Sequence, residues 1–221
     1  MDARTTARTL AAKTAIALLV GTILVVICYF FVDRPMAWFV HDQCCWSEEV
    51  LRWPPLISEW LKNAAILVMM PIVLWWVWKP GGRLQTILLA LSATCLVTTL
   101  LKQMLKWTAG RYWPETWKHH NPSLIGTGDY GFHPFHFGVA YESFPSGHAA
   151  VTCAMMAVLW VACPRWRWLC ALLSALVCAA LVGMNYHFVG DVVAGSIIGS
   201  ITGIYTARWF RLAPSPAASA Q

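Results

Sequence analysis

Six long stretches of this 221-residue chain contain no charged side chain and are apolar enough to lie in a lipid bilayer. A transmembrane helix needs about 20 mainly apolar residues, with about 17 as a working lower limit. Apolar residues make up 58% of the chain and charged residues only 12%, so apolar sequence is not confined to one anchor. The sequence excludes a soluble monomer and predicts an all-α, polytopic membrane protein with six transmembrane helices in one domain, residues 1–221. The stretches are residues 14–32, 63–78, 84–101, 147–163, 169–186 and 192–207.

The first and last stretches need separate interpretation. Residues 14–32 follow three basic residues and resemble the apolar core of a secretory signal peptide, but no small-x-small cleavage site precedes Asp33. We therefore expect an uncleaved first helix. The sixth stretch is rich in Gly and Ser, which favours close packing against other helices over contact with lipid.

Basic residues set the expected orientation, because cytoplasmic loops retain Lys and Arg. With the N-terminus inside, nine of the 16 Lys and Arg residues lie on the cytoplasmic side: Arg4, Arg8, Lys13, Lys79, Arg83, Arg165, Arg167, Arg208 and Arg211. The outer side then holds two long segments, residues 33–62 and 102–143, which we expect to be outer-face loops. The first is expected to lie along the interface as a packing lid. The second is too long for a simple connection and too aromatic for disorder, which indicates a functional loop.

The cysteines indicate little chemistry. Six of the eight lie in or at the ends of the apolar stretches, where a thiol behaves as a small apolar group. Cys44 and Cys45 are adjacent on the expected outer side, where disulfides form, and the sequence leaves their redox state open.

Three short polar segments fall at the predicted outer ends of the apolar stretches. They span residues 106–114, 143–148 and 187–191. Segments that are distant in the chain but fold onto the same membrane face can converge on one pocket. We therefore expect a single active site at the outer face.

The second segment predicts the start of a helix at a phosphate site. Ser146 is a preferred N-cap residue and precedes an apolar run. A helix N-terminus offers unpaired N–H groups and the positive end of the helix dipole, both of which favour phosphate. Gly147 lets a ligand approach the backbone, and His148 would lie beside the bound anion.

The third segment pairs an imidazole with a carboxylate. His187 and Asp191 are one helical turn apart, so Asp191 can accept a hydrogen bond from one ring nitrogen and leave the other as a nucleophile or base. The alternative is that Asp191 only caps a helix, although a carboxylate at the start of a membrane span favours function. The first segment adds Lys106 and Arg111, with Lys102 one turn earlier; such residues also anchor helix ends at the interface.

The order Lys…Pro, then Pro-Ser-Gly-His, then His-x-x-x-Asp resembles the signature of the type 2 phosphatidic acid phosphatase and vanadium haloperoxidase superfamily, in its membrane-bound branch. The resemblance covers about residues 84–208. It implies that His187 is the nucleophile on phosphorus, that Asp191 orients it and that His148 is the general acid. It also implies phosphate binding by Lys106, Ser146 and the backbone of Gly147, with no metal and no other cofactor.

Two arginines of that signature are missing here. Trp113 stands where the first motif has Arg, and Leu181 stands where the third motif has Arg six residues before its His. We expect Arg111 to bind phosphate in their place, with help from Lys102 or His136.

The predicted function is hydrolysis of a lipid phosphate monoester or pyrophosphate through a phosphohistidine. The expected location is the inner membrane of a bacterium, with the active site on the periplasmic side. Phosphatidic acid, phosphatidylglycerol phosphate, undecaprenyl pyrophosphate and the phosphates of lipid A all fit, as does transfer to an acceptor other than water. Membrane lipids are the expected surroundings, no nucleic-acid partner is expected, and the oligomeric state is left open.

Two other classes of protein fit part of the sequence. The missing arginines also fit a non-catalytic membrane protein that binds or scaffolds lipid phosphates. The outer segment holds four histidines, His119, His120, His133 and His136, which fits a metal-binding or transport protein. No Cys or carboxylate completes an obvious metal set beside them, so contact with substrate or interface is the favoured interpretation.

Overall fold

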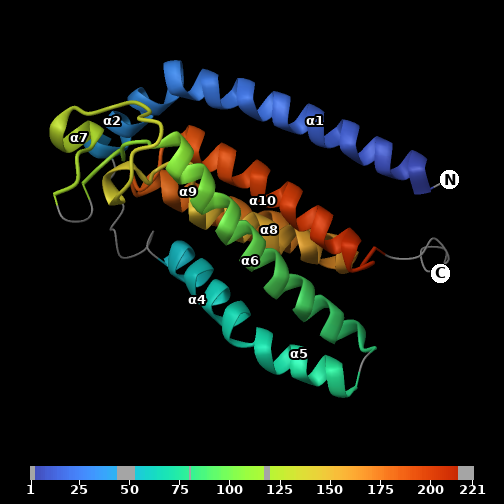
Figure 1. Ribbon diagram of the computed structural model, residues 1–221. Helices are drawn as coiled ribbons and strands as arrows, with labels where there is room; N and C mark the ends of the chain where they lie inside the picture. Colours follow the sequence, from blue (N-terminus) through green and yellow to red (C-terminus); the bar gives the residue numbers. More distant parts are fainter. Residues whose placement is uncertain (1–2, 44–52, 80, 117–119, 214–221) are drawn as a thin grey trace.

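The computed structural model describes residues 3–43, 53–79, 81–116 and 120–213, and within these ranges every regular element is a helix. Figure 1 shows long helices side by side, with α2, α7 and the loops gathered at one end. Cys44, Cys45 and His119 lie outside the described residues. The elements are α1 (Ala3–Ile27), a π-helical turn (Cys28–Val32), α2 (Asp33–Gln43), α4 (Trp53–Leu67), α5 (Met69–Trp78), α6 (Arg83–Ala109), α7 (Leu124–Thr127), a 3-10 turn (Val139–Tyr141), α8 (Gly147–Ala162), a 3-10 turn (Pro164–Trp166), α9 (Arg167–Gly183) and α10 (Val189–Trp209).

Each of the six predicted apolar stretches lies largely in helix, but they differ in length. Four helical segments of the described chain are long and apolar enough to cross a membrane: Arg8–Gln43, Arg83–Ala109, Pro164–Gly183 and Val189–Trp209. Two others, Lys62–Trp78 and Gly147–Ala162, are apolar but shorter. The all-helical membrane architecture is therefore confirmed, whereas spanning length is reached by four helices rather than six.

The two segments predicted as outer-face loops, residues 33–62 and 102–143, are partly helical in the structure. Residues 33–43 continue the first helix through the π-helical turn, and α4 begins at Trp53. Helix α6 continues past Leu101 to Ala109, and its C-cap residue Gly110 has a φ of 57°, the left-handed conformation typical of a helix end. A lysine ends an apolar stretch without ending a helix, since Lys is a good helix former. The predicted boundaries marked a change in polarity instead of a change in backbone.

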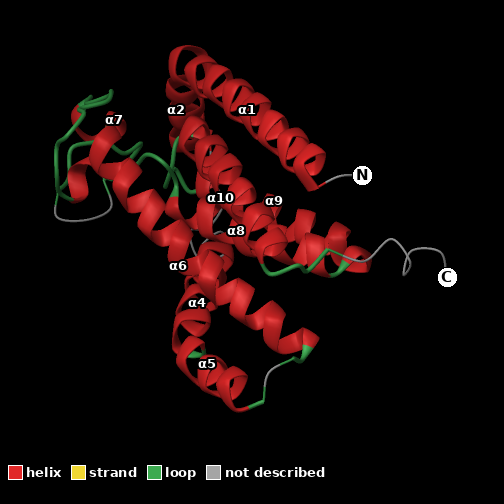
Figure 2. Cartoon of the chain, turned by 45° about the vertical axis from the view of Figure 1, so that its right-hand side comes forward, coloured by secondary structure: helices red, strands yellow, loops and turns green. Residues whose placement is uncertain are grey.

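Helices α8 and α10 form the tightly packed centre of the bundle (Figure 2). Gly195, Gly199 and Gly203 of α10 face the backbone of α8, and a Cβ added to them would lie 2.4, 2.1 and 2.2 Å from carbonyl oxygens of α8 or its N-cap. The sequence prediction of close packing for this Gly-rich helix is confirmed. The close contact also fixes how the N-termini of the two helices stand relative to each other.

The polar ends of three helices meet at the end of the bundle where α2 and α7 lie (Figures 1 and 2). These are the C-terminus of α6 and the N-termini of α8 and α10. The antiparallel course of α6 and α8 therefore brings the three predicted polar segments together.

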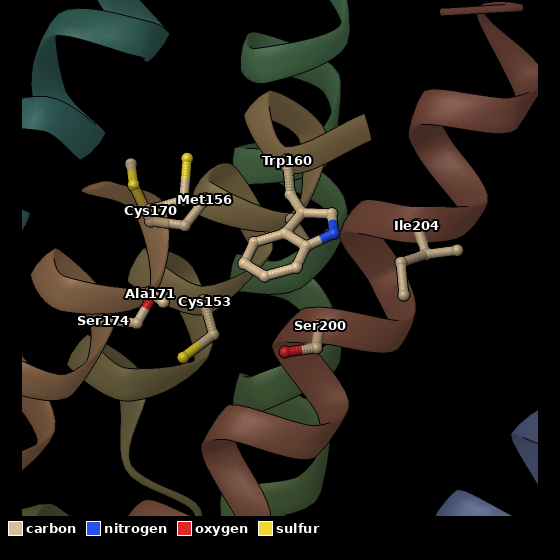
Figure 3. A pocket seen from close by; sticks show the side chains of 9 residues that line it. Cys153, Met156, Trp160, Cys170, Ala171, Ser174, Ser200 and Ile204 are labelled. Atoms are coloured by element: carbon tan, nitrogen blue, oxygen red, sulfur yellow. The ribbon is translucent and has the colours of Figure 1, made fainter. Parts of the chain in front are cut away.

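A pocket lies within the bundle and is lined by residues outside these polar segments (Figure 3). It opens between α8, α9 and α10, and its lining includes Cys153, Met156, Trp160, Ser174 and Ser200. None of the site residues predicted from the sequence lines it.

Candidate active site

The last two turns of α6 carry the lysines of the site. The Nζ of Lys106 lies 3.9 Å from Oε2 of Glu142. The Nζ of Lys102 lies against the backbone of Gly147, only 2.8 Å from where a Cβ on that residue would be. Within the described part of the chain, no carboxylate lies within 4.0 Å of the Lys102 ammonium. The cluster therefore holds a cation without a close counter-ion, and an anion is favoured beside it.

Helix α8 begins where the sequence predicted, at the edge of this lysine cluster. Ser146 is the N-cap, and its side chain accepts a hydrogen bond from the backbone N–H of Ala149. The backbone N–H of Ser146 donates to the carbonyl of Asp191 at 3.0 Å, which ties the start of α8 to the start of α10. A phosphate at this N-terminus would meet helix N–H groups and the Lys102 ammonium together.

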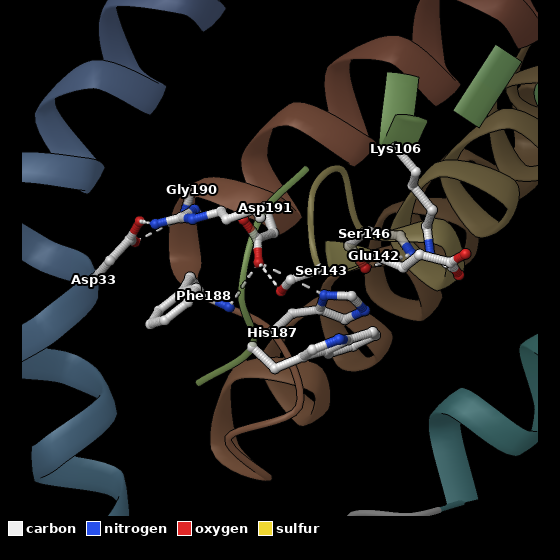
Figure 4. Close-up of polar contacts among 12 residues, drawn as sticks. Asp33, Lys106, Glu142, Ser143, Ser146, His187, Phe188, Gly190 and Asp191 are labelled. Atoms are coloured by element: carbon white, nitrogen blue, oxygen red, sulfur yellow. Dashed lines mark hydrogen bonds and ion pairs between the residues drawn. The ribbon is translucent and has the colours of Figure 1, made fainter. Parts of the chain in front are cut away.

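The predicted pair of His187 and Asp191 is brought together, with both side chains buried (Figure 4). His187 lies in the turn between α9 and α10, and Asp191 lies in the first turn of α10. The His187 Nδ1 is 3.7 Å from Oδ2 of Asp191, which is longer than a hydrogen bond. Catalytic contacts are often this long in unliganded sites and tighten with substrate. Because Nδ1 faces the carboxylate, Nε2 is the nitrogen left for a substrate.

Burial is the main cause of the low pKa of His187, which falls to about 4. The Asp191 carboxylate raises this pKa, while Lys106 and His148 lower it further. The imidazole is therefore neutral across the neutral pH range, as a nucleophile requires.

Arg111 does not take the predicted place on a phosphate. Its side chain is fully buried, and its guanidinium donates to Oδ1 of Asp191 at 2.5 Å and to Oδ2 of Asp33 at 2.7 Å. Although burial opposes it, these two carboxylates raise the pKa of Arg111 above its usual range. The prediction that Arg111 binds phosphate is wrong for this geometry, because both terminal nitrogens already hold carboxylates.

The positions of the two missing arginines are filled by packed apolar side chains. The centroid of the Trp113 ring lies 5.2 Å from the centroid of the His187 ring and 5.8 Å from the Lys106 Nζ. Leu181 is fully buried in a cluster with Ala149 and Val192. Neither position can supply charge, whereas the Lys102 ammonium lies against Gly147 at the start of α8.

Sequence reasoning missed the partner of His148. The His148 Nε2 lies 3.2 Å from Oε1 of Glu59, a residue of α4 that also pairs with Lys62. The hydrogen bond with His148 and the contact with Lys62 lower the pKa of Glu59 to about 2 against the effect of burial. The ring of Tyr186 lies 5.8 Å from that of His148 and 5.2 Å from that of His187, so it stands against both imidazoles.

Asp33 and Ser143 were also missed as contributors. Asp33 pairs with Arg111, and the Ser143 hydroxyl donates to Oδ2 of Asp191 at 2.6 Å (Figure 4). The sequence did contain a signal for Asp33. It directly follows the first apolar stretch, just as Asp191 directly precedes the last, and a carboxylate at the edge of a membrane span favours a function.

The histidines of residues 102–143 do not form a metal site in the part of the chain that the structure describes. No three His, Cys, Asp or Glu side chains there are grouped so that they could hold a metal ion. His136 is exposed, and its ring lies against those of His133 and Tyr141. The predicted help of His136 in phosphate binding has no support in these contacts.

Comparison with known proteins places the three motifs in one family. The model of the PAP2 superfamily matches residues 87–214, which include all three polar segments. A protein of Rhizobium etli named lipid A 1-phosphatase is 32% identical over 136 residues, 56% of this chain and 53% of the relative. A protein of the same name from Rhizobium johnstonii is 32% identical over 133 residues, 55% of this chain and 50% of the relative. The chain thus spans about half the length of the curated relatives it matches.

A solved structure has a similar arrangement of helices. It is the crystal structure of a transmembrane PAP2-type phosphatidylglycerolphosphate phosphatase from Bacillus subtilis, with a TM-score of 0.56 and 16% sequence identity. The similarity covers 89% of this chain and 95% of that one. At this identity the similarity concerns the fold alone.

Proposed function

Because this chain belongs to the PAP2 superfamily, we propose that it hydrolyses the phosphate monoester or pyrophosphate of a membrane lipid, with His187 as the nucleophile. The observation that carries the proposal is the position of His187. It is buried against Asp191, whose backbone carbonyl accepts a hydrogen bond from the N-cap of α8, where no carboxylate of the described residues lies close to the Lys102 ammonium. A nucleophile beside an anion site is the arrangement that phosphoryl transfer needs.

The reaction proceeds in two displacements. The neutral Nε2 of His187 attacks phosphorus while the bond from phosphorus to the lipid oxygen breaks, and protonated His148 gives its proton to that leaving oxygen. Asp191 stabilises the positive charge that develops on the His187 ring. Water then attacks the phosphohistidine, His148 takes a proton from that water, and the products are free phosphate and neutral His187.

The oxygens of the transferred group are held by Lys102, Lys106 and the N–H groups at the start of α8. This assignment keeps the predicted contributions of Lys106, Ser146 and Gly147 and replaces Arg111 with Lys102. Cations and helix-start N–H groups both stabilise charge on a phosphoryl group.

We place the site at the outer face of the membrane. The end of the bundle opposite the site carries the basic residues Lys79, Arg83, Arg165, Arg167 and Arg208. Cytoplasmic loops retain positive charge, so that end is assigned to the cytoplasm. In a bacterium the catalytic end then faces the periplasm.

The test of the proposal is a panel of lipid phosphates offered to the purified protein in detergent. The panel holds phosphatidic acid, phosphatidylglycerol phosphate, undecaprenyl pyrophosphate and lipid A, which the names of the relatives make the first choice. Release of phosphate from at least one of them, blocked by vanadate and unchanged by a chelator, is expected. No release from any of them, or loss of release with chelator, would count against the proposal.

A second candidate function is non-catalytic binding of a lipid phosphate. It is favoured by the replacement of two guanidinium positions with Trp113 and the buried Leu181. Saturable binding of the same lipids without release of phosphate would support this candidate in place of hydrolysis.

The low pKa of His187 predicts where activity is lost on the acid side. The ring must be neutral to attack. The value of kcat/KM should therefore stay constant from neutral pH to about pH 5 and fall as the pH drops through about 4. The folded-state pKa of His187 lies below its unfolded value, so the unfolded chain binds more protons, and stability should also decline between about pH 6.5 and 4. Thermal unfolding measured at each pH separates the two effects, and activity that rises steadily from pH 4 to 9 would contradict the assignment.

Lys102 is predicted to bind the phosphate directly. Lys102→Met removes a charge-assisted contact of about 1.5 to 3 kcal/mol, so KM and the inhibition constant of vanadate should rise about 10- to 100-fold. Lys79→Met, the same change at an exposed residue beyond the far end of α5, serves as the control and should change neither constant. Unchanged vanadate inhibition in Lys102→Met would remove Lys102 from the site.

A further inference from the structure

A buried group of three charged residues joins the first helical segment to the catalytic carboxylate. Arg111 lies between Asp191 and Asp33, and all three side chains are fully or almost fully buried. The guanidinium is also enclosed by aromatic rings, with its Cζ 4.3 Å from the ring centroid of Phe188 and 4.9 Å from that of Phe132. The guanidinium therefore has no exposed surface, and both of its terminal nitrogens are paired with carboxylates.

The contacts of Asp191 divide between its two oxygens. Oδ1 accepts from Arg111, whereas Oδ2 accepts from the hydroxyl of Ser143 and the backbone N–H of Phe188 and faces the His187 ring (Figure 4). The carboxylate plane is therefore fixed from both sides. Its orientation toward Nδ1 of His187 depends on the contact with Arg111.

We propose that Arg111 and Asp33 are positioning residues that act on His187 through Asp191. The inference rests on the proposed function, since it concerns how the nucleophile of that reaction is held. Neither residue contacts the substrate. Arg111 sets the direction of the Asp191 carboxylate. Asp33 neutralises part of the positive charge of Arg111, so Asp191 keeps more of its negative charge for His187.

The charge of the group explains why a second carboxylate is needed. One guanidinium and two carboxylates carry a net charge of −1. Without Asp33, Arg111 and Asp191 would neutralise each other, and little net negative charge would face His187 as its ring becomes positive on phosphorylation. In a buried site such charge is poorly screened, so its effect on the reacting ring is large.

Asp33 is built into the start of α10 as well. Its Oδ1 accepts a hydrogen bond from the backbone N–H of Gly190 at 2.9 Å, and a Cβ on Gly190 would lie 3.0 Å from Oδ2 of Asp33. The family match begins at residue 87, so Asp33 lies outside it. The first helical segment therefore contributes to catalysis in addition to anchoring the chain.

The first test is Asp33→Asn, with rapid-quench measurement of phosphohistidine formation and vanadate binding to count active sites. We expect the rate of phosphohistidine formation per vanadate-binding site to fall about 10- to 100-fold, by analogy with the loss of outer-shell partners of metal-binding histidines. The vanadate affinity should stay within about twofold. Asp129→Asn, the same change at an outer-face carboxylate bonded to Thr127, is the matched control and should alter neither quantity.

A merely structural function of Asp33 would lower the number of vanadate-binding sites and leave the rate per site unchanged, and that result would overturn the inference. Should Asp33→Asn not be recovered folded, Arg111→Lys decides the question, because it keeps the charge. We expect Arg111→Lys to lower the rate per site about tenfold at unchanged vanadate affinity. A tenfold weaker vanadate affinity at an unchanged rate would instead show that Arg111 contacts the phosphate. If the unmodified protein releases no phosphate from any lipid, the proposed function has failed, and this is distinguishable from a failure of the inference.

Discussion

His187→Ala is expected to abolish phosphate release, lowering kcat by about 10⁴-fold or more, as removal of a nucleophile does in hydrolases with covalent intermediates. The physical reason is that no other described side chain combines a neutral imidazole, a buried carboxylate partner and a position beside the start of α8. Vanadate should still bind to the variant, though more weakly, because Lys102, Lys106 and the helix N–H groups remain. The measurement is phosphate release from the best lipid of the panel.

The control for this variant is His136→Ala. It makes the same change at an exposed histidine of the segment between α6 and α8, where the ring contacts His133 and Tyr141. Activity of the control should stay within about twofold of the unmodified protein, as for most surface substitutions. If His187→Ala retained activity within tenfold of the unmodified protein, the nucleophile would have to be another group.

Among Gly→Ala substitutions in α10, Gly199→Ala is expected to lower the stability of the protein most. The new Cβ would lie 2.1 Å from the carbonyl oxygen of Ala150, and this oxygen belongs to the backbone of α8, which has no rotamer with which to move away. Overpacking costs about 1 to 3 kcal/mol, and a backbone conflict belongs at the upper end of that range. The gain of up to about 1 kcal/mol from the better helix propensity of Ala is too small to offset it.

The same variant should also lose activity, because α8 carries His148 and the turn leading into α10 carries His187. Separating the two helices disturbs the hydrogen bond from the Ser146 N–H to the Asp191 carbonyl. Thermal unfolding in detergent and phosphate release per folded protein are the two measurements. Gly82→Ala is the matched control, since a Cβ there meets only the Gln85 side chain, at an ordinary 3.7 Å. Equal stability of the two variants would show that α8 and α10 leave room for a Cβ at Gly199.

The helical architecture and most of the catalytic set could be predicted from the sequence. Uncharged apolar runs predict helices because the bilayer offers no hydrogen-bond partners, so the backbone N–H and C=O groups of such a run must pair with each other. Ser146 predicted a helix start, and the four-residue spacing of His187 and Asp191 predicted their proximity; both are observed. These features are local, so residue order alone determines them.

The helix ends and the partners of the site residues were less accessible. Charge ended the predicted apolar stretch before Lys102, but α6 continues to Ala109, so Lys102 and Lys106 lie on a helix rather than in a loop. Glu59 pairs with His148 across 89 positions of sequence, a distance at which no spacing rule applies.

Arg111 shows most clearly where the sequence and the tertiary structure divide. From the sequence, a guanidinium two residues from a missing arginine was the natural candidate for binding phosphate. In the structure the chain turns at Gly110, and Arg111 is directed into the protein, where Asp33 and Asp191 bind it. The sequence by itself determined which parts of the chain are helical and which imidazoles and carboxylate are present for the chemistry. Only the tertiary structure decided which charges face the substrate and which neutralise one another, because electrostatic pairing depends on distance in space and on burial.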